Sequence, residues 1–436
     1  MSARGGETLG TGSGPESPSR SAGPLKGLSL APVRALRPAV DSTRLGRLLC
    51  PPYDVISERQ RQELLAADPD NAVAVILPRS SNGEDPYQAA ARRLESWSAS
   101  GLFAVAAQPA LYIYEMTSAD GAVTRGWLGA VELRDPADSV ILPHEDTMPG
   151  PVADRLALMT ATEADLEPIY LIYDGGGAAS HVVAAADALP EVASAVTPDG
   201  IGHRLWAVTS PDVHAEVDAD LRTRRALIAD GHHRYATYLE RQRQLRAYRG
   251  AGPWDRGLSL LVDSSSYGPQ VRAIHRVVHG LSFDAACTGA ATIGQVTPVA
   301  DARAALAGLN EEPEFAAVLT DGDHTAMVRG LREDVLSAVD EPAALARLDV
   351  TVVHRVLVAR AWRVPDREDV VGYAHALDDA IAEAQRTRGV AVLLRPTPVA
   401  AVTAVAAAGS RMPRKTTLFV PKPASGLVMR RFRDQT

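Results

Sequence analysis

Residues 228–237, Ile228-Ala-Asp-Gly-His-His-Arg-Tyr-Ala-Thr237, place an acid, a glycine, two histidines and an arginine in five consecutive positions. The apolar run Ala226 to Ala229 precedes the polar residues and predicts a buried strand, and a helical pattern starts at Tyr235. Free backbone N–H groups and the helix dipole favour an anion at a strand-to-helix junction. We therefore expect a phosphate-binding turn here, in a fold that combines strands and helices.

Each residue of this turn has a candidate role. Gly231 allows the backbone to approach a ligand closely, and Arg234 supplies a planar fork for phosphate oxygens. Asp230 is a candidate for holding a metal ion or accepting a proton. Because His232 and His233 are consecutive, at most one of them is expected to face the same ligand as Arg234. A structural alternative stays open, since Asp-Gly is a common turn and an arginine there can pair with the acid.

Composition excludes several classes of protein. The chain has 436 residues, 46% of them hydrophobic, which is enough for a large core and two or three domain-sized units. A net charge of −8 and only 5% aromatic residues argue against nucleic-acid binding. The two cysteines, Cys50 and Cys287, are far apart, which fits a reducing compartment. No apolar run approaches the roughly 20 residues of a membrane helix. We expect a cytoplasmic protein that binds neither membrane nor nucleic acid.

The pattern along the chain predicts an α+β fold with mixed, largely antiparallel sheets, packed helices and two lobes. Three hairpins are expected because β-prone runs flank Asp-Gly turns at residues 120–121, 199–200 and 321–322. Helical patterns cover residues 58–67, 86–99, 152–163, 235–248, 348–362 and 375–386. Residues 1–24 are expected to form a disordered tail, residues 25–290 the main domain, and residues 291–436 a second lobe.

A second cluster of titratable groups is Pro143-His-Glu-Asp-Thr-Met-Pro-Gly-Pro151, between a strand-like run and a predicted helix. Glu145 is a candidate general base or metal ligand, with His144 beside it. The candidate substrate-binding residues are Tyr53 and Asp54 in a proline-rich loop, and Arg155 in the first turn of the predicted helix. A solvated acidic loop that caps a helix is an open alternative for this cluster.

Four cations and two hydroxyl groups lie within Arg411-Met-Pro-Arg-Lys-Thr-Thr-Leu-Phe-Val-Pro-Lys422. Only three of the 45 basic residues are lysines, and two of these three are in this stretch. Arg414, Lys415 and Thr416 are therefore candidate contacts for a polyphosphate. The upstream glycines of a P-loop are missing, which excludes a Walker motif. A solvated basic turn is the alternative.

Together and in this order, these motifs resemble the bacterial and archaeal family catalogued as domain of unknown function 1015. The matching pieces are Arg34-Ala-Leu-Arg-Pro38, Pro51-Pro-Tyr-Asp-Val-Ile-Ser57, His144-Glu-Asp-Thr-Met-Pro-Gly-Pro151 with Asp154-Arg155-Leu156, Ala229-Asp-Gly-His-His-Arg-Tyr235, and Met412-Pro-Arg-Lys-Thr-Thr417 with Pro421-Lys422. The chain departs from the family at three positions, Asp146 for glutamate, Asp165 for asparagine and Thr416 for serine.

The Asp-Gly-His-His-Arg turn is also similar to the Gly-x-x-Arg turn of a superfamily of sulfiredoxins, ParB-type partition CTPases and free-serine kinases. In that superfamily the turn binds nucleotide phosphates. The resemblance implies a nucleotide-dependent phosphotransferase that acts on a small hydroxyl compound, with free L-serine as the first candidate and with Mg²⁺ and ATP or ADP as cofactors. It implies catalytic roles for His144, Glu145, Asp230 and His232, phosphate contacts from Gly231, His233, Arg234, Arg414, Lys415 and Thr416, and Mg²⁺ at Asp230 and Glu145.

Two other functions stay open at this point. One is a metal-dependent hydrolase, in which a divalent transition ion is bound by His144, Glu145, Asp230 and His232. The other is a regulatory protein that binds a nucleotide without catalysis. The sequence does not predict which acceptor is used or how many subunits assemble.

Overall fold

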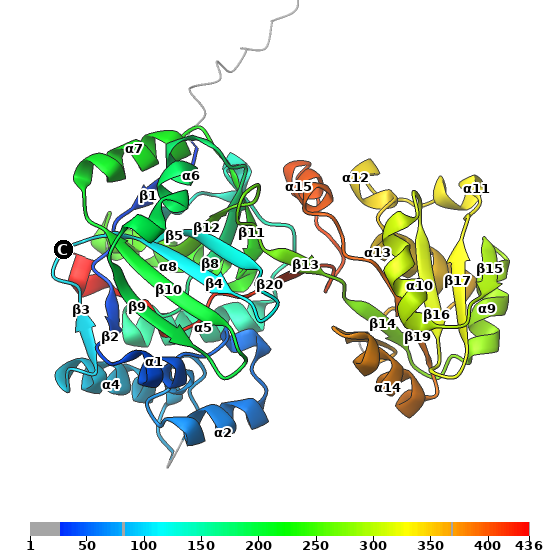
Figure 1. Ribbon diagram of the computed structural model, residues 1–436, viewed down its shortest axis with the longest axis horizontal. Helices are drawn as coiled ribbons and strands as arrows, with labels where there is room; N and C mark the ends of the chain where they lie inside the picture. Colours follow the sequence, from blue (N-terminus) through cyan, green and yellow to red (C-terminus); the bar gives the residue numbers. More distant parts are fainter. Residues whose placement is uncertain (1–26, 81–82, 368, 436) are drawn as a thin grey trace, which may run out of the picture.

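The computed structural model describes residues 27–80, 83–367 and 369–435, which form two lobes (Figure 1). The larger lobe contains a nine-stranded sheet, and the smaller lobe a six-stranded sheet. Helices pack on both sheets, so the fold is α+β with largely antiparallel strands, as predicted. The predicted tail, residues 1–24, lies outside the described residues. No helix in the described part of the chain is long and apolar enough to span a membrane.

The nine-stranded sheet has the order β6-β11-β8-β12-β5-β4-β10-β9, and β1 pairs with β5. Only the β6–β11 and β8–β12 pairs are parallel. Its strands are β1 (Leu30–Ala31), β4 (Leu111–Thr117), β5 (Val123–Glu132), β6 (Ile141–Leu142), β8 (Ile169–Tyr173), β9 (Glu191–Val196), β10 (Gly202–Val208), β11 (Ala226–Asp230) and β12 (Arg256–Asp263).

Both faces of the sheet are buried at β8 and β11, which explains why these two strands are almost entirely apolar, whereas the edge strand β9 is largely exposed. In β11, for example, Leu227 and Ala229 belong to the core on one face, and Ala226 and Ile228 to the core on the other. The helices of the larger lobe are α1 (Ser42–Leu48), α2 (Glu58–Ala67), α3 (Val73–Ile76), α4 (Pro86–Ala99), α5 (Pro149–Thr162), α6 (Gly177–Ala184), α7 (Pro211–Leu221) and α8 (His232–Arg249).

The six-stranded sheet of the smaller lobe has the order β15-β17-β16-β19-β14-β18, and every neighbouring pair is antiparallel. Its strands are β14 (His275–Val278), β15 (Gln295–Pro298), β16 (Ala316–Thr320), β17 (Thr325–Arg329), β18 (Val371–Ala374) and β19 (Val390–Leu393). Its helices are α9 (Phe283–Ala291), α10 (Ala302–Gly308), α11 (Glu333–Leu336), α12 (Ala343–Ala346), α13 (Asp349–Val352), the π-helix η6 (Val353–Ala361) and α14 (Leu377–Thr387).

The chain enters the smaller lobe after β13 (Gln270–Arg272) and leaves it through α15 (Val399–Ala407) and β20 (Leu418–Val420), which pairs with β13. The last residues return to the larger lobe, where β21 (Arg430–Arg431) pairs with β7 (Ala164–Asp165). The six-stranded sheet thus begins at β14, before the predicted division at 290 and 291. The C-terminal strand pairs with the larger lobe, although it falls in the predicted second domain.

Local sequence rules account for most elements. The three Asp-Gly turns join β4 to β5, β9 to β10, and β16 to β17, as predicted. Helix α2 begins after Ser57, whose side chain accepts a hydrogen bond from the Gln60 backbone N–H. Some boundaries differ from the prediction: α8 begins at His232 instead of Tyr235, α5 at Pro149 instead of Val152 and α14 at Leu377 instead of His375, and the helix expected over 348–362 is mostly η6.

One of the remaining short elements lies beside the candidate site, and the others lie elsewhere in the two lobes. The exception is the 3₁₀ helix η1 (Tyr53–Val55), which follows the double proline. The others are the strand pair β2 (Leu36–Pro38) and β3 (Phe103–Val105), and the 3₁₀ turns η2 (Pro136–Asp138), η3 (Ala186–Ala188), η4 (Pro253–Asp255), η5 (Leu309–Glu311) and η7 (Phe432–Gln435).

Candidate functional site

The junction between β11 and α8 is built around Gly231. Asp230 is the last residue of β11, and Gly231 adopts φ +93°, a left-handed conformation that favours glycine. A Cβ atom at this position would lie 3.1 Å from Nε of Arg234. Gly231 therefore lets the chain turn sharply into the helix and makes room for the Arg234 side chain, which folds back beneath the turn.

Arg234 is an internal residue, because only 1% of it is exposed. One guanidinium nitrogen donates to the Pro168 carbonyl at 2.6 Å, and another forms an ion pair with Asp230 at 2.5 Å. The second oxygen of Asp230 pairs with the Lys422 ammonium group. Burial alone raises the pKa of Asp230, but the charges of Lys422 and Arg234 outweigh burial and lower it. In this conformation Arg234 pairs with Asp230, as in the structural alternative considered for the turn from the sequence.

The two consecutive histidines bind the backbone of the acidic loop, residues 143–148, which precedes α5. Nε2 of His232 accepts a hydrogen bond from the His144 N–H at 3.2 Å, and Nε2 of His233 accepts one from the Met148 N–H at 3.0 Å. Both imidazoles must be neutral at Nε2 to accept these bonds. Burial lowers the pKa of both histidines, that of His232 well below its ordinary value. The first turn of α8 therefore grips the loop on either side of Glu145.

Glu145 is partly buried and surrounded by charges of both signs. Burial raises the pKa of its carboxyl to about 7, with Lys415 and Lys422 opposing this shift and Asp230 and Asp54 reinforcing it. A carboxyl whose pKa is near 7 is suited to act as a general base at neutral pH.

The basic loop, residues 411–417, packs directly on the acidic loop. The Met412 N–H donates to the His144 carbonyl at 2.8 Å, and Thr417 Oγ1 lies 3.0 Å from Nε2 of His144. Burial lowers the pKa of His144 to about 4, so its ring is neutral at physiological pH. The structure thus brings the C-terminal motif, which is far away in sequence, to the β11–α8 turn.

Individual residues of the basic loop differ in accessibility. Lys415 is exposed and has a positive φ of +54°, and Arg414 is also exposed. Thr416 is buried, and its hydroxyl donates to the Pro413 carbonyl at 2.5 Å. The Thr416 hydroxyl therefore closes a turn within the loop, and Lys415 is the residue of the loop that presents its charge to Glu145.

The predicted substrate-binding residues form a layered group beside the turn. Arg155 is 2% exposed, and its guanidinium lies over the Tyr53 ring at 4.1 Å from the ring centroid. It also pairs with Asp154 at 2.6 Å. The Tyr53 N–H donates to buried Glu167 at 3.0 Å. Asp54 is exposed at the front of this group, so it is the member that a substrate can reach.

Sequence reasoning left two residues of this network out of the candidate site. Lys422 lies in the basic C-terminal stretch that ends at this residue. The scarcity of lysine, three in the whole sequence, could have marked it as a candidate. Glu167 is 4% exposed, accepts from Ser425 Oγ at 3.0 Å and faces Arg155. No pattern in the sequence distinguishes it from a surface acid.

The residues present do not fit a resident Mg²⁺ at Asp230, because each of its carboxylate oxygens already contacts a cation, Lys422 or Arg234. In the described part of the chain, no three His, Cys, Asp or Glu side chains come together in an arrangement that can hold a metal ion. The two histidines predicted as hydrolase ligands each use one ring nitrogen elsewhere, since Nε2 of His232 accepts from the His144 N–H and Nε2 of His144 contacts Thr417.

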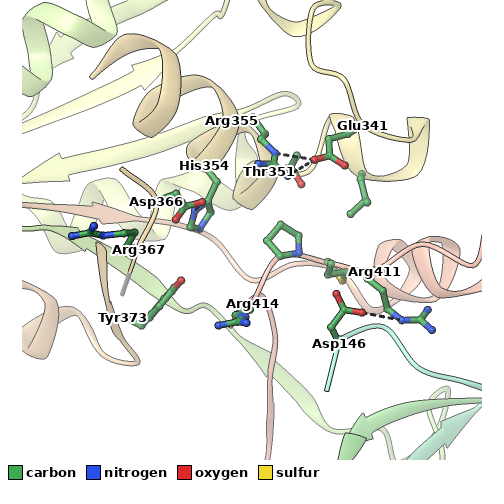
Figure 2. Close-up of a pocket in the computed structure, with 13 residues that line it drawn as sticks. Asp146, Glu341, Thr351, His354, Arg355, Asp366, Arg367, Tyr373, Arg411 and Arg414 are labelled. Atoms are coloured by element: carbon green, nitrogen blue, oxygen red, sulfur yellow. Dashed lines mark hydrogen bonds and ion pairs between the residues drawn. The ribbon is translucent and has the colours of Figure 1, made fainter. Parts of the chain in front are cut away.

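A pocket of about 520 Å³ opens between the two lobes, next to the acidic and basic loops (Figure 2). Asp146 and Arg414 line it from the side of the candidate site, and His354, Arg355 and Tyr373 line it from the smaller lobe. We call Glu145 and the charges that act on it, Lys415, Lys422, Asp230 and Asp54, the charged cluster. Glu145 and Lys415 belong to this cluster, and their chain neighbours Asp146 and Arg414 line the pocket.

A family model described as "Protein of unknown function (DUF1015)" matches residues 30–351. The chain belongs to this family. None of the curated proteins compared with the chain matches it.

Solved structures give distant likenesses. A free serine kinase mutant in complex with ADP is 15% identical, with a TM-score of 0.34, over 68% of this chain and 90% of that chain. A conserved hypothetical protein from Pyrococcus furiosus is 16% identical, with a TM-score of 0.32, over 68% of this chain and 94% of that chain. SbnI with a C-terminal truncation, from Staphylococcus aureus, is 12% identical, with a TM-score of 0.34, over 68% of this chain and 87% of that chain.

Proposed function

We propose that this DUF1015 protein is a nucleotide-dependent phosphotransferase that acts on a small hydroxyl compound. The observation that carries the proposal is the environment of Glu145. Burial raises the pKa of the Glu145 carboxyl to about 7, the charges of Lys415 and Lys422 act on it, and the first turn of α8 bonds the backbone on both sides of it. This arrangement combines a base for a hydroxyl proton with positive charges for a phosphoryl group, which are the two requirements of phosphoryl transfer.

In the proposed reaction, the acceptor oxygen attacks the terminal phosphorus of the nucleotide. The bond between that phosphorus and the bridging oxygen breaks, and the shortened nucleotide leaves with the electron pair. Glu145 takes the hydroxyl proton. Lys415 and the N–H groups of the first turn of α8 stabilise the phosphoryl charge. His232 and His233 keep Glu145 in position by holding the backbone on both sides of it.

Three assignments implied by the family resemblance change in this proposal. Arg234 is no longer among the phosphate contacts, because it is 1% exposed and already has two partners, whereas Lys415 keeps the phosphate-binding role predicted for it. His232 and His233 act as positioning residues for the acidic loop. Mg²⁺ enters only as part of the nucleotide substrate, since Asp230 has no oxygen left for it.

The acceptor is a small hydroxyl compound, for which the resemblance to free-serine kinases makes L-serine the first to test. Purified protein is incubated with Mg²⁺, ATP or ADP, and a panel of hydroxylated compounds that includes L-serine, and the phosphorylated product is measured by mass spectrometry. The proposal predicts acceptor-dependent product that Glu145→Gln abolishes. Glu63→Gln is the matched control, because Glu63 is exposed on α2 and pairs only with Arg59 among the described residues.

Nucleotide binding without any acceptor-dependent product across the panel would favour a regulatory nucleotide-binding protein instead. Product that forms equally well with Glu145→Gln would leave a transferase but refute the assigned base.

A further inference from the structure

The inter-lobe pocket contains a polar group that lacks a partner. Thr351, in α13, is 1% exposed and lines the pocket, and its Oγ1 is buried without a hydrogen-bond partner among the described residues. Buried hydroxyl groups are nearly always hydrogen-bonded. Figure 2 shows Thr351 on the same wall as Arg355 and Glu341, which pair with each other at 2.6 Å. An unpaired hydroxyl at a pocket wall makes Thr351 a candidate contact for a ligand in the pocket.

The size and lining of the pocket indicate which ligand fits. Its volume of about 520 Å³ is typical of a small-molecule site, and a compound as small as serine would leave most of it filled with water. Charged and polar side chains make up most of its lining, and Leu345, Met412, Pro413 and the Tyr373 ring supply its apolar part. Apolar and aromatic surface beside a hydrogen-bonding hydroxyl suits a nucleobase and ribose better than an amino acid.

The positive charges of the basic loop indicate where the phosphates of such a ligand lie. Arg411 and Arg414 line the side of the pocket formed by the basic loop, and Lys415 follows directly towards the charged cluster. Arg276 of β14 ties this loop to the smaller lobe, since its guanidinium donates to the Lys415 carbonyl at 3.0 Å and to Nε2 of His354 at 3.1 Å. A phosphate chain that leaves the pocket past Arg414 therefore reaches Lys415.

We propose that the inter-lobe pocket binds the base and ribose of the nucleotide, with Thr351 as a hydrogen-bonding contact and the phosphates directed along Arg414 to Lys415. This inference rests on the proposed function, because it locates that reaction's nucleotide. It also gives the smaller lobe a role, since the lobe supplies Thr351 and Tyr373. The site is completed only where the two lobes meet.

The test uses AMP and adenosine as probes and isothermal titration calorimetry on the full chain. Thr351→Val keeps the shape of the side chain and removes only the hydroxyl. It is expected to weaken AMP and adenosine binding by about twofold to tenfold, the range for one neutral hydrogen bond. The melting temperature without ligand should be unchanged or higher, because the variant removes an unsatisfied buried group. Thr292→Val, at the end of α9 and outside the pocket, is the control.

Hydrogen exchange on the unmodified protein gives a second readout that depends on no variant. AMP is expected to slow exchange in residues 343–358 and 411–415. Unchanged affinity for Thr351→Val together with protection confined to other segments would overturn the inference.

The two proposals fail in different ways. If Thr351→Val weakens AMP binding but no acceptor is ever phosphorylated, the pocket assignment stands and the transferase falls. If turnover depends on Glu145 while Thr351→Val binds AMP like the wild type and AMP protects only other segments from exchange, the transferase stands and the pocket assignment falls.

Discussion

The sharpest structural prediction concerns the internal ion pair of the Asp-Gly-His-His-Arg turn. In Asp230→Asn, Arg234 loses the acid with which it forms its ion pair and keeps only the weaker charge effects of Glu167 and Asp54, while only 1% of it is exposed and arginine cannot give up its proton. Removing one member of a buried pair costs about 3–5 kcal/mol. Lys422 also loses its partner, but its side chain is 16% exposed and can turn to water. At about 2 °C per kcal/mol for a large domain, the melting temperature should fall by roughly 6–10 °C.

Two other variants fix the order of the effects. Arg234→Met leaves Asp230 paired with Lys422 and Glu167 with the charge of Arg155, and it strands the buried Pro168 carbonyl, which costs about 1–3 kcal/mol. The control, Asp378→Asn, breaks an exposed pair with Arg303 and should cost less than about 1 kcal/mol. Calorimetric melting of the three variants without ligand should thus rank Asp230→Asn as the least stable and Asp378→Asn as the most stable.

The opposite result would show that Arg234 is a ligand-binding residue. In that case Arg234→Met would melt at the wild-type temperature and only its nucleotide affinity would drop. Such an outcome would refute the internal role assigned to this arginine and restore the phosphate contact implied by the family resemblance.

Three further predictions follow from the site. His233→Phe removes the acceptor for the Met148 N–H and should lower kcat while leaving the nucleotide Kd within about twofold, whereas a phosphate-binding histidine would change the Kd. The pKa of Glu145 is about 7 in the folded protein and about 4.5 in the unfolded chain, so the free energy of unfolding decreases as pH rises from 4.5 to 7. Melting curves of Glu145→Gln over this pH range should lack this decrease. Because Asp230 already contacts two cations, EDTA should leave the melting temperature unchanged, and a drop of several degrees would revive the metal-dependent alternative.

Elements set by local sequence were predictable. The three Asp-Gly hairpins and helices α2 and α4 match their predictions because turn residues, caps and apolar periodicity act within a few positions of each other. The start of α8 was missed by three residues, since the polar run from His232 to Arg234 does not show the helical pattern of apolar residues.

The contacts that give the candidate site its chemistry are long-range, and no pattern within the sequence reports them. Lys422 and Asp230 are 192 positions apart, and His144 and Thr417 are 273 apart. Which way Arg234 points was equally open, because an arginine that binds phosphate and one that pairs internally have the same spacing from the glycine. Both the long-range contacts and the direction of Arg234 depend on how the chain returns from the smaller lobe, because this return places the basic loop on the acidic loop.

The measurement that bears most directly on the central claim is the rate of phosphoryl transfer to the best acceptor by wild-type protein and Glu145→Gln, each followed from pH 5 to pH 9. A base that ionises at about 7 predicts that the wild-type rate rises with pH and levels off above 7, and that the variant is slower by about 10²–10⁴-fold on this plateau and lacks the rise below it. A variant that retains the wild-type rate and pH profile would contradict the assignment of Glu145 as the group that accepts the proton.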